Sequence, residues 1–329
     1  MRKSPFYCWS ILVSIANLID PLLNAISIGP VVDPFLVPLP LPIDPFLVNF
    51  DRRFRRGRRI SDAKPKNYSH RDQDNWAASF PACNLTQQSP ISILSYGVET
   101  DPTLFIDFGP FYDIWLERAE MKNDGTTVEI EFMGGLTPVF SGSVVNNDLY
   151  RFHQMHFHWG SDDTVGSEHV IDGVQFPLEL HMVHFNDKYT SLAQAASQPD
   201  GLSVLAILFK PSLVNNPFLD PLIYDLANVR CAYRRIDFNF RIILAQLLPV
   251  NTQLFFTYRG SLTTPPCFES VQWIIFRQLV PIGIAQLLQF RLLTSDAECR
   301  TLIGDNWRRV QPVNARVVRQ PLLPVKGIW

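Results

Sequence analysis

Beyond residue 62 the pattern of apolar and polar residues changes to short runs of the β-strand type. The runs TVEIEF, LYRFHQMHFHW, VLAILFK and QLFFTY are typical of β-strands, and Gly, Asn, Asp and Pro turns separate them. One longer helical pattern lies near residues 221–228. Many strands at short spacing with little helix predict a mainly β fold with minor α, which we place as a single domain at residues 63–329.

The start of the chain follows a different pattern. A basic beginning precedes an apolar stretch from Phe6 to Ile19, too short to span a bilayer comfortably, and Asp20 and Pro21 follow it. We interpret residues 1–25 as a secretory signal peptide; a buried N-terminal helix is the alternative. The sequence shows no second apolar segment of membrane length and no lipid-anchor tail. We therefore expect a secreted, extracellular protein without a transmembrane segment.

Residues 26–62 are predicted to be a disordered leader or linker. DPFLV occurs at residues 33–37 and again at 44–48, and so much proline favours an extended chain because it removes backbone donors and fixes φ. The run RRFRRGRR follows at residues 52–59. It is either a site for a protease that cuts after paired basic residues or a solvated surface segment, and we expect neither to be a fold element.

Charge and cysteine content narrow the function classes. The formal net charge is −2, and the basic residues crowd into one short run, so a nucleic-acid partner is not expected. Four cysteines remain after the predicted signal peptide, and at least one pair should be bridged in an oxidising compartment. The triplets that begin at Asn67 and Asn84 match N-glycosylation sites. Nothing in the composition predicts the oligomeric state.

Six of the seven histidines fall within residues 153–184, which indicates a common cause. Strand alternation places four side chains on one face and His153 on the other; the four are Phe152, Gln154, His156 and His158. An i, i+2 histidine pair can clamp a metal ion, although two histidines packed on a sheet without metal would give the same pattern. In LELHMVHFN the same rule groups Glu179, His181 and Val183 on one face and Leu180, Met182 and His184 on the other.

The carboxylate and the amide beside these histidines suit a metal centre. A zinc-bound histidine usually donates its second ring N–H to an acceptor, and Glu179 and Gln154 can accept from His181 and His156. Three neutral histidines leave the fourth position of the metal open, as in a catalytic site, whereas a structural zinc site would need a fourth protein ligand. Zn²⁺ there would lower the pKa of bound water to about 7.

These residues also carry a family signature. QMHFHWGS, GSEHVID, LELHMVHFN, GSLTTPPC and DNWRRVQPVNAR occur in order, and from about Tyr68 to Arg316 the chain resembles the α-class carbonic anhydrases. The resemblance implies a ten-stranded, mostly antiparallel twisted β-sheet with a zinc ion in a central cleft. It also implies reversible hydration of carbon dioxide to bicarbonate and a proton by a zinc-bound hydroxide.

The resemblance assigns roles to individual residues. The implied zinc ligands are His156, His158 and His181. Thr263 would accept a hydrogen bond from the zinc-bound hydroxide and donate one to Glu168, because a carboxylate can only accept. Thr264 would border the substrate, and the backbone carbonyl of Asn306 would orient His158. The apolar wall that receives carbon dioxide would consist of Val183, Val204, Leu262 and Trp273, and His169 and His184 would be buried structural histidines.

One position departs from the family pattern. The resemblance places Thr126 where the fastest members have a histidine that carries the proton to buffer, and threonine does not titrate near neutral pH. Turnover should therefore be limited by proton transfer. His153 or His70 could substitute for the missing histidine.

The resemblance also implies a disulfide between Cys83 and Cys267. Cys231 and Cys299 have no counterpart, so they are free or paired together. Residues 215–250 differ from the family in composition. This segment is either a partner surface or a local insertion. The functional alternative is a catalytically weak extracellular binding or matrix protein on the same fold, but such relatives typically lose a zinc histidine.

Overall fold

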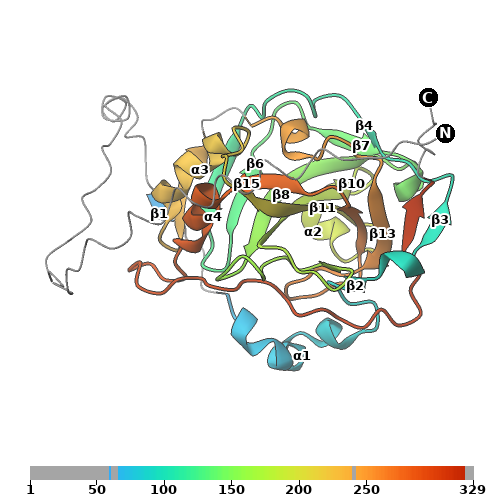
Figure 1. The fold of residues 1–329 in the computed structure, drawn as a ribbon, viewed down its shortest axis with the longest axis horizontal. Helices are drawn as coiled ribbons and strands as arrows, with labels where there is room; N and C mark the ends of the chain where they lie inside the picture. Colours follow the sequence, from blue (N-terminus) through green and yellow to red (C-terminus); the bar gives the residue numbers. More distant parts are fainter. Residues whose placement is uncertain (1–58, 61–65, 239–241, 323–329) are drawn as a thin grey trace, which may run out of the picture. The chain divides into compact units, whose positions relative to one another are not determined.

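The structure is a computed structural model that describes residues 59–60, 66–238 and 242–322 (Figure 1). The chain divides into Met1–Arg55 and Arg56–Trp329, and every described residue belongs to the second unit. The predicted signal peptide at residues 1–25 and almost all of the predicted linker at 26–62 lie outside the described residues. The domain boundaries therefore stay predictions.

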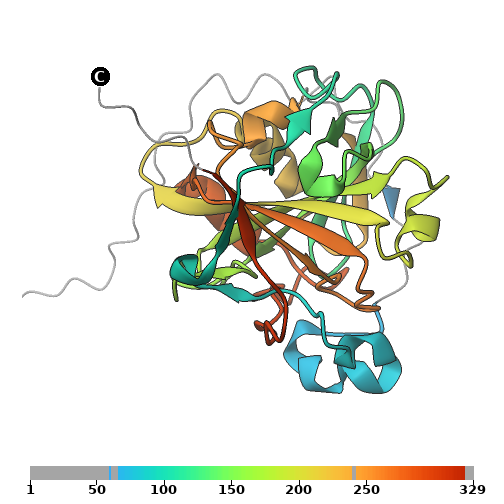
Figure 2. The same ribbon diagram turned by 90° about the vertical axis from the view of Figure 1, so that its right-hand side faces the viewer.

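A large twisted sheet forms the centre of this unit (Figures 1 and 2). Its strand order is β1 (Arg59–Ile60), β12 (Arg234–Phe238), β5 (Ala119–Asn123), β6 (Val128–Phe132), β8 (Tyr150–Trp159), β10 (Leu178–Asn186), β11 (Leu202–Ser212), β14 (Val271–Phe276), β13 (Phe255–Gly260), β16 (Arg319–Pro321) and β3 (Glu99–Asp101). Beside this path lie β4 (Asp107–Phe108), β7 (Val139–Ser141) and β15 (Val280–Gly283), and a separate small sheet joins β2 (Ser92–Ile93) to β9 (Val170–Ile171).

The strands pair mostly antiparallel, as expected. Only β11 with β14, β11 with β15, and β16 with β3 run parallel within this sheet of the described residues. The sheet has fourteen strands there rather than the ten expected, because several two- to four-residue strands join its edges. One of these short strands contains Arg59, which pairs with Arg235, so the end of the arginine run is part of the fold, contrary to expectation.

The sheet separates two hydrophobic cores, and β11 contributes to both. Leu205, Ile207 and Phe209 are buried in the first core, while Val204, Ala206 and Leu208 are buried in the second. This explains why the run VLAILF is continuously apolar: a central strand covered on both faces has no side exposed to water.

Helices are few and short. The predicted helix near residues 221–228 is confirmed as α3 (Asp220–Leu226), which begins with Pro221 in its first turn, where the missing N–H costs nothing. It packs on α4 (Ile284–Arg291), which the sequence pattern did not reveal (Figure 1). The remaining helical turns are η2 (His70–Asn75), α1 (Trp76–Ser79), η3 (Pro81–Asn84), η4 (Ser95–Gly97), η5 (Ser143–Val145), α2 (Leu192–Ala195), η6 (Ala227–Val229) and η7 (Leu244–Leu247). Among the described residues, every helix is too short or too polar to cross a bilayer.

A β-bulge interrupts the alternation on β8. Tyr150, Phe152, Met155, Phe157 and Trp159 are all buried in the first core. Against β10, Gln154 pairs with Val183 but Phe152 pairs with His184, which leaves His153 as the extra residue of the bulge. Our expectation that Phe152 shares a face with Gln154 and that His153 points the other way is therefore wrong. Phe152 faces the first core, and His153 lies on the same face as Gln154.

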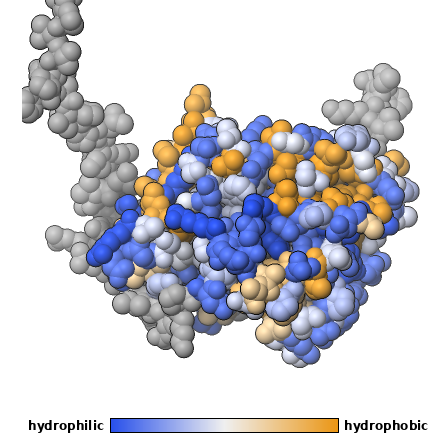
Figure 3. All heavy atoms as spheres, turned by 90° about the horizontal axis from the view of Figure 1, so that it is seen from below, coloured by the Kyte–Doolittle hydropathy of each residue, from blue (hydrophilic) through white to orange (hydrophobic). Residues whose placement is uncertain are grey.

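Two disulfides join distant segments. Cys83 in η3 is bonded to Cys267 in the loop after β13, with an S–S distance of 2.08 Å. Cys231 is bonded to Cys299, which decides between the two states left open for this pair. Within the described part of the segment at residues 215–250, α3 and η6 contribute buried residues to the first core. The molecular face in Figure 3 is mostly hydrophilic, with apolar side chains gathered toward one side.

Candidate metal centre

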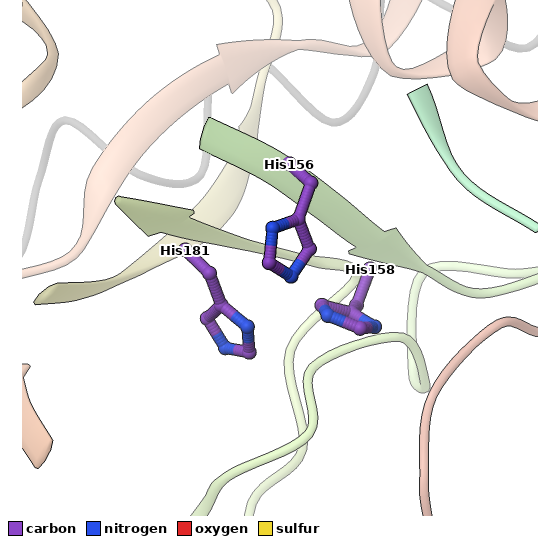
Figure 4. Close-up of side chains that lie close together, drawn as sticks. All are labelled: His156, His158 and His181. Atoms are coloured by element: carbon purple, nitrogen blue, oxygen red, sulfur yellow. The ribbon is translucent and has the colours of Figure 1, made fainter. Parts of the chain in front are cut away.

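Three histidines from two adjacent strands lie close together (Figure 4). His156 on β8 stands directly opposite His181 on β10, and His158 follows two residues along β8 on the same face. Their ring centroids are 4.6 to 5.2 Å apart. One ring nitrogen from each histidine lies within 4.8 Å of the other two, which is a spacing that could hold a metal ion.

The second ring nitrogen of each histidine is held by an oxygen atom. The three bonds are His156 Nδ1 to Gln154 Oε1 at 2.9 Å, His158 Nδ1 to the Asn306 carbonyl at 2.8 Å, and His181 Nε2 to Glu179 Oε1 at 2.7 Å. Because all three oxygens only accept hydrogen bonds here, these ring nitrogens must donate. The opposite nitrogens, Nε2 of His156 and His158 and Nδ1 of His181, therefore carry the lone pairs that a metal requires.

The donor set fits Zn²⁺. The Nε2 atom of His158 is buried and has no hydrogen-bond partner among the described residues, which would be costly without a ligand. Burial lowers the pKa of His158 to about 4, and burial is also the largest cause that lowers the pKa of His156 and His181. All three rings are consequently neutral at pH 7, the form that binds a metal.

Glu179 anchors the inner side of this centre. Its carboxylate accepts hydrogen bonds from the backbone N–H groups of Glu168 and His169, both at 2.8 Å, and from the rings of His169 and His181, both at 2.7 Å. Burial alone would raise its pKa, but the two histidines outweigh burial and hold the pKa well below its ordinary value. Glu179 therefore stays ionised and fixes the ring of His181.

Glu168 and Thr263 lie next to the histidines, although they are distant in sequence. Oε1 of Glu168 is 3.3 Å from Nδ1 of His158 and accepts from the backbone N–H of Arg308 at 2.8 Å. Burial raises the pKa of Glu168 to about 7, and a hydrogen bond with the Thr263 side chain opposes this rise. Thr263 itself is buried. The structure thus brings together the pair that the resemblance named.

An apolar surface flanks the histidines. Val183, Val204 and Trp273 are buried in the second core, and Leu262 packs against it. The ring centroid of Trp273 is 4.8 Å from that of His181. The four residues of the predicted wall thus belong to one hydrophobic cluster, and Trp273 places that cluster beside the metal centre.

Thr126 and Thr264 meet at Tyr68, a residue that the sequence did not single out. The Tyr68 hydroxyl hydrogen-bonds the side chains of both threonines. Thr126 also bonds Asp124 Oδ1 through its backbone N–H and its hydroxyl, both at 2.8 Å. Asp124 in turn pairs with Lys66 at 3.2 Å. No local sequence signal reveals this cluster, because it joins segments that meet only in the folded chain.

The sequence also did not predict a cluster of charged side chains on β5 and β6. Lys122 Nζ lies 2.7 Å from Glu129 and 2.8 Å from Glu131. Glu129 stands opposite His156, and Glu131 stands opposite Gln154. The alternation in TVEIEF does predict that the two glutamates share a face, but the partner strand could not be read from it.

This fold and site define an enzyme class, and comparison with known proteins agrees. The chain belongs to the eukaryotic-type carbonic anhydrase family, whose model matches residues 71–321. It is 38% identical over 261 residues to carbonic anhydrase 6 of Canis lupus familiaris, covering 78% of this chain and 80% of that protein. It is 35% identical over 250 residues to carbonic anhydrase 6 of Homo sapiens, covering 75% of this chain and 79% of that protein. The predicted fold class and enzyme class are confirmed, and the substrates are carbon dioxide and bicarbonate.

Proposed function

We propose that this protein is a secreted zinc enzyme that hydrates carbon dioxide reversibly, with the zinc ion held by His156, His158 and His181. One observation carries the proposal: the buried, unpartnered Nε2 of His158 lies beside two histidines whose other ring nitrogens are already engaged. A zinc ion held there would lower the pKa of a coordinated water to about 7 and make hydroxide available at neutral pH.

Glu168 and Thr263 would set the orientation of the nucleophile at the open side of the centre. Because an ionised Glu168 can only accept, the Thr263 hydroxyl would donate its hydrogen bond to Glu168, and the Thr263 oxygen would then accept on its other side. Thr263 would therefore orient the nucleophile by accepting a hydrogen bond from it, which leaves a lone pair of the nucleophile aimed at the substrate carbon. Thr264, held by Tyr68, would border the product oxygens.

The apolar wall binds the substrate. Carbon dioxide carries no charge, so Val183, Val204, Leu262 and Trp273 can hold it by contact while they exclude water. Placing the substrate there leaves the nucleophile in position, and the two reactants meet in a fixed orientation.

Proton release limits turnover in this proposal. Thr126 stands at the position where a titrating group would serve, and its hydroxyl is already bonded to Asp124. A threonine hydroxyl takes up no proton near neutral pH, so the proton must leave by another group.

Secretion is supported by the covalent chemistry of the chain. Two disulfides indicate an oxidising compartment, and both Asn67 and Asn84 are exposed, as glycosylation requires. The signal peptide at residues 1–25, the linker at 26–62 and the two glycosylation sites are part of the proposal. An extracellular binding protein without catalysis is not favoured, because all three histidines and the Glu168–Thr263 pair are in place.

The test is the metal content and activity of the purified protein. We expect about one zinc per chain, carbon dioxide hydration in a pH-indicator assay, and inhibition by an aryl sulfonamide. The variant His158→Asn should lose zinc and activity together, whereas His153→Gln, outside the predicted ligand set, should keep its zinc. Bound zinc without hydration would contradict the proposed enzyme and favour the binding protein.

A further inference from the structure

Because of the β-bulge on β8, His153 lies on the same face as Gln154 and not on the opposite face, where strict alternation would place it. Its Nε2 lies 3.8 Å from Oε1 of Glu131 on β6, and its ring centroid is 6.1 Å from that of Phe185 on β10. Glu131 stands opposite Gln154, whose side chain holds His156. Phe185 packs against the same core as the apolar wall. Both neighbours of His153 therefore belong to the face that carries the metal centre.

His153 is also partly open to solvent, and water molecules would bridge its separation from the centre. It precedes His156 by three residues, roughly 10 Å along a strand that rises about 3.3 Å per residue. Its side chain is 29% exposed. A proton that arrives at this ring from the centre can consequently leave to a buffer molecule.

We infer that His153 carries the proton released by carbon dioxide hydration from the metal centre to the buffer, with Glu131 positioning its ring. The inference rests on the proposed function. Water and carbon dioxide give bicarbonate and one proton; the proton adds to the neutral imidazole, and the imidazolium then gives it to a buffer base, which restores the neutral ring. No electrons are exchanged.

The surroundings of His153 suit this exchange. Burial, the largest influence, and Lys122 lower the pKa of the ring below its ordinary value, while Glu131, which pairs with Lys122 at 2.8 Å, opposes this fall. An imidazole accepts and releases protons well when its pKa lies near the working pH. Phe185, the neighbour from β10, carries no charge.

His70, the other histidine considered for this role, does not suit it. Its Nε2 is buried without a hydrogen-bond partner among the described residues, and burial lowers its pKa to about 3. Such a ring stays neutral at every pH near neutrality and therefore passes no protons. His70→Gln is therefore a matched control for His153→Gln.

The experiment measures hydration by the zinc-loaded full chain as a function of buffer concentration. In His153→Gln we expect kcat at low buffer to fall by about 100-fold, the lower end of the contribution of general acid–base catalysis, with kcat/KM unchanged. Free imidazole should restore kcat, and His70→Gln should leave the buffer dependence as in wild type. Unchanged kcat in His153→Gln at low buffer would overturn the inference. A wild type that binds zinc and hydrates nothing would instead overturn the proposed function, and this inference with it.

A second readout does not depend on turnover. The His153 ring is titrated by NMR in the zinc-loaded protein, wild type and Glu131→Gln. Since Glu131 raises the pKa of His153, its neutralisation should lower that pKa. An unshifted titration would overturn the role assigned to Glu131.

Discussion

Gln154 illustrates at the residue scale how a side chain that never touches the metal would control it. Its amide oxygen accepts from His156 Nδ1 at 2.9 Å, which fixes the tautomer and turns Nε2 toward the centre. The sequence predicted this contact because Gln154 and His156 are two residues apart on one regular stretch of strand. It could not predict Tyr68, since the partners of that hydroxyl come from loops far along the chain.

We expect Gln154→Ala to weaken zinc binding by about 10- to 100-fold, because the His156 ring would lose its fixed tautomer. Competition with a chelator measures the affinity. Gln194→Ala, an amide on the exposed surface of α2, serves as the control and should bind zinc like wild type. Equal affinities in the two variants would contradict the role of Gln154.

We expect Thr126→His to raise kcat in well-buffered solution, because it adds a titrating ring at the position that lacks one. The backbone N–H of residue 126 keeps its bond to Asp124, so the turn should survive. Stopped-flow hydration with a pH indicator measures the change. A rate equal to that of wild type would mean that proton transfer does not limit turnover.

His184 should make stability depend on pH. The Tyr112 hydroxyl donates to its Nε2 at 2.6 Å, its Nδ1 donates to the Met182 carbonyl at 3.0 Å, and burial lowers its pKa to about 3. An unfolded histidine titrates near 6.5, so between these values the unfolded chain binds the extra proton and stability falls as the pH falls.

From pH 7 to pH 5, this histidine alone should cost about 2 kcal/mol of the free energy of unfolding. Urea unfolding of the zinc-free protein measures it, with His184→Asn as the comparison. The variant is less stable than wild type at both pH values. Its free energy of unfolding should, however, fall by about 2 kcal/mol less than that of wild type between pH 7 and pH 5. Identical losses would show that His184 is not buried as a neutral ring.

At the scale of the element, β8 shows where sequence patterns succeed and where they fail. The alternation placed His156 with His158 correctly, because both lie in a regular stretch paired with β10. It failed at Phe152 and His153, because the bulge is set by the register with β10 and not by the local sequence. The last residue of the arginine run was likewise missed, since its strand exists only through pairing with β12.

The two faces of β8 should differ sharply in their energetics. Phe157 is fully buried, with its ring centroid 4.8 Å from that of Phe290, and Phe157→Ala should lower the free energy of unfolding by about 3 to 5 kcal/mol. Arg151 pairs with Asp187 near the surface, and Arg151→Ala should cost about 0 to 1 kcal/mol. Equilibrium urea unfolding compares them, and similar costs would contradict the assigned faces.

At the scale of the whole molecule, two disulfides join segments that are distant in sequence, and only one of them was predicted. The family resemblance implied the bond between Cys83 and Cys267, whereas Cys231 and Cys299 were left open because nothing in their spacing shows that the loop before β12 and the loop after α4 meet. The resemblance likewise implied the sheet and its cleft but not the short strands at its edges.

Removing the first disulfide should cost more than removing the second. The bonds close 184 and 68 residues, and the chain-entropy model gives about 5 and about 4 kcal/mol respectively. Urea unfolding of Cys83→Ala/Cys267→Ala and Cys231→Ala/Cys299→Ala tests the order. The first double variant should also lose hydration activity, since Cys267 closes the loop that carries Thr263, and the second should retain it. The reverse order in both properties would contradict this account.

The most direct test of the metal centre is a crystal structure of the purified protein with diffraction data recorded at the zinc absorption edge. The account predicts one zinc ion bound by Nε2 of His156, Nε2 of His158 and Nδ1 of His181 at about 2.0 to 2.1 Å, with a fourth position not filled by the protein. A centre without zinc, or one in which a protein side chain completes the coordination, would contradict it.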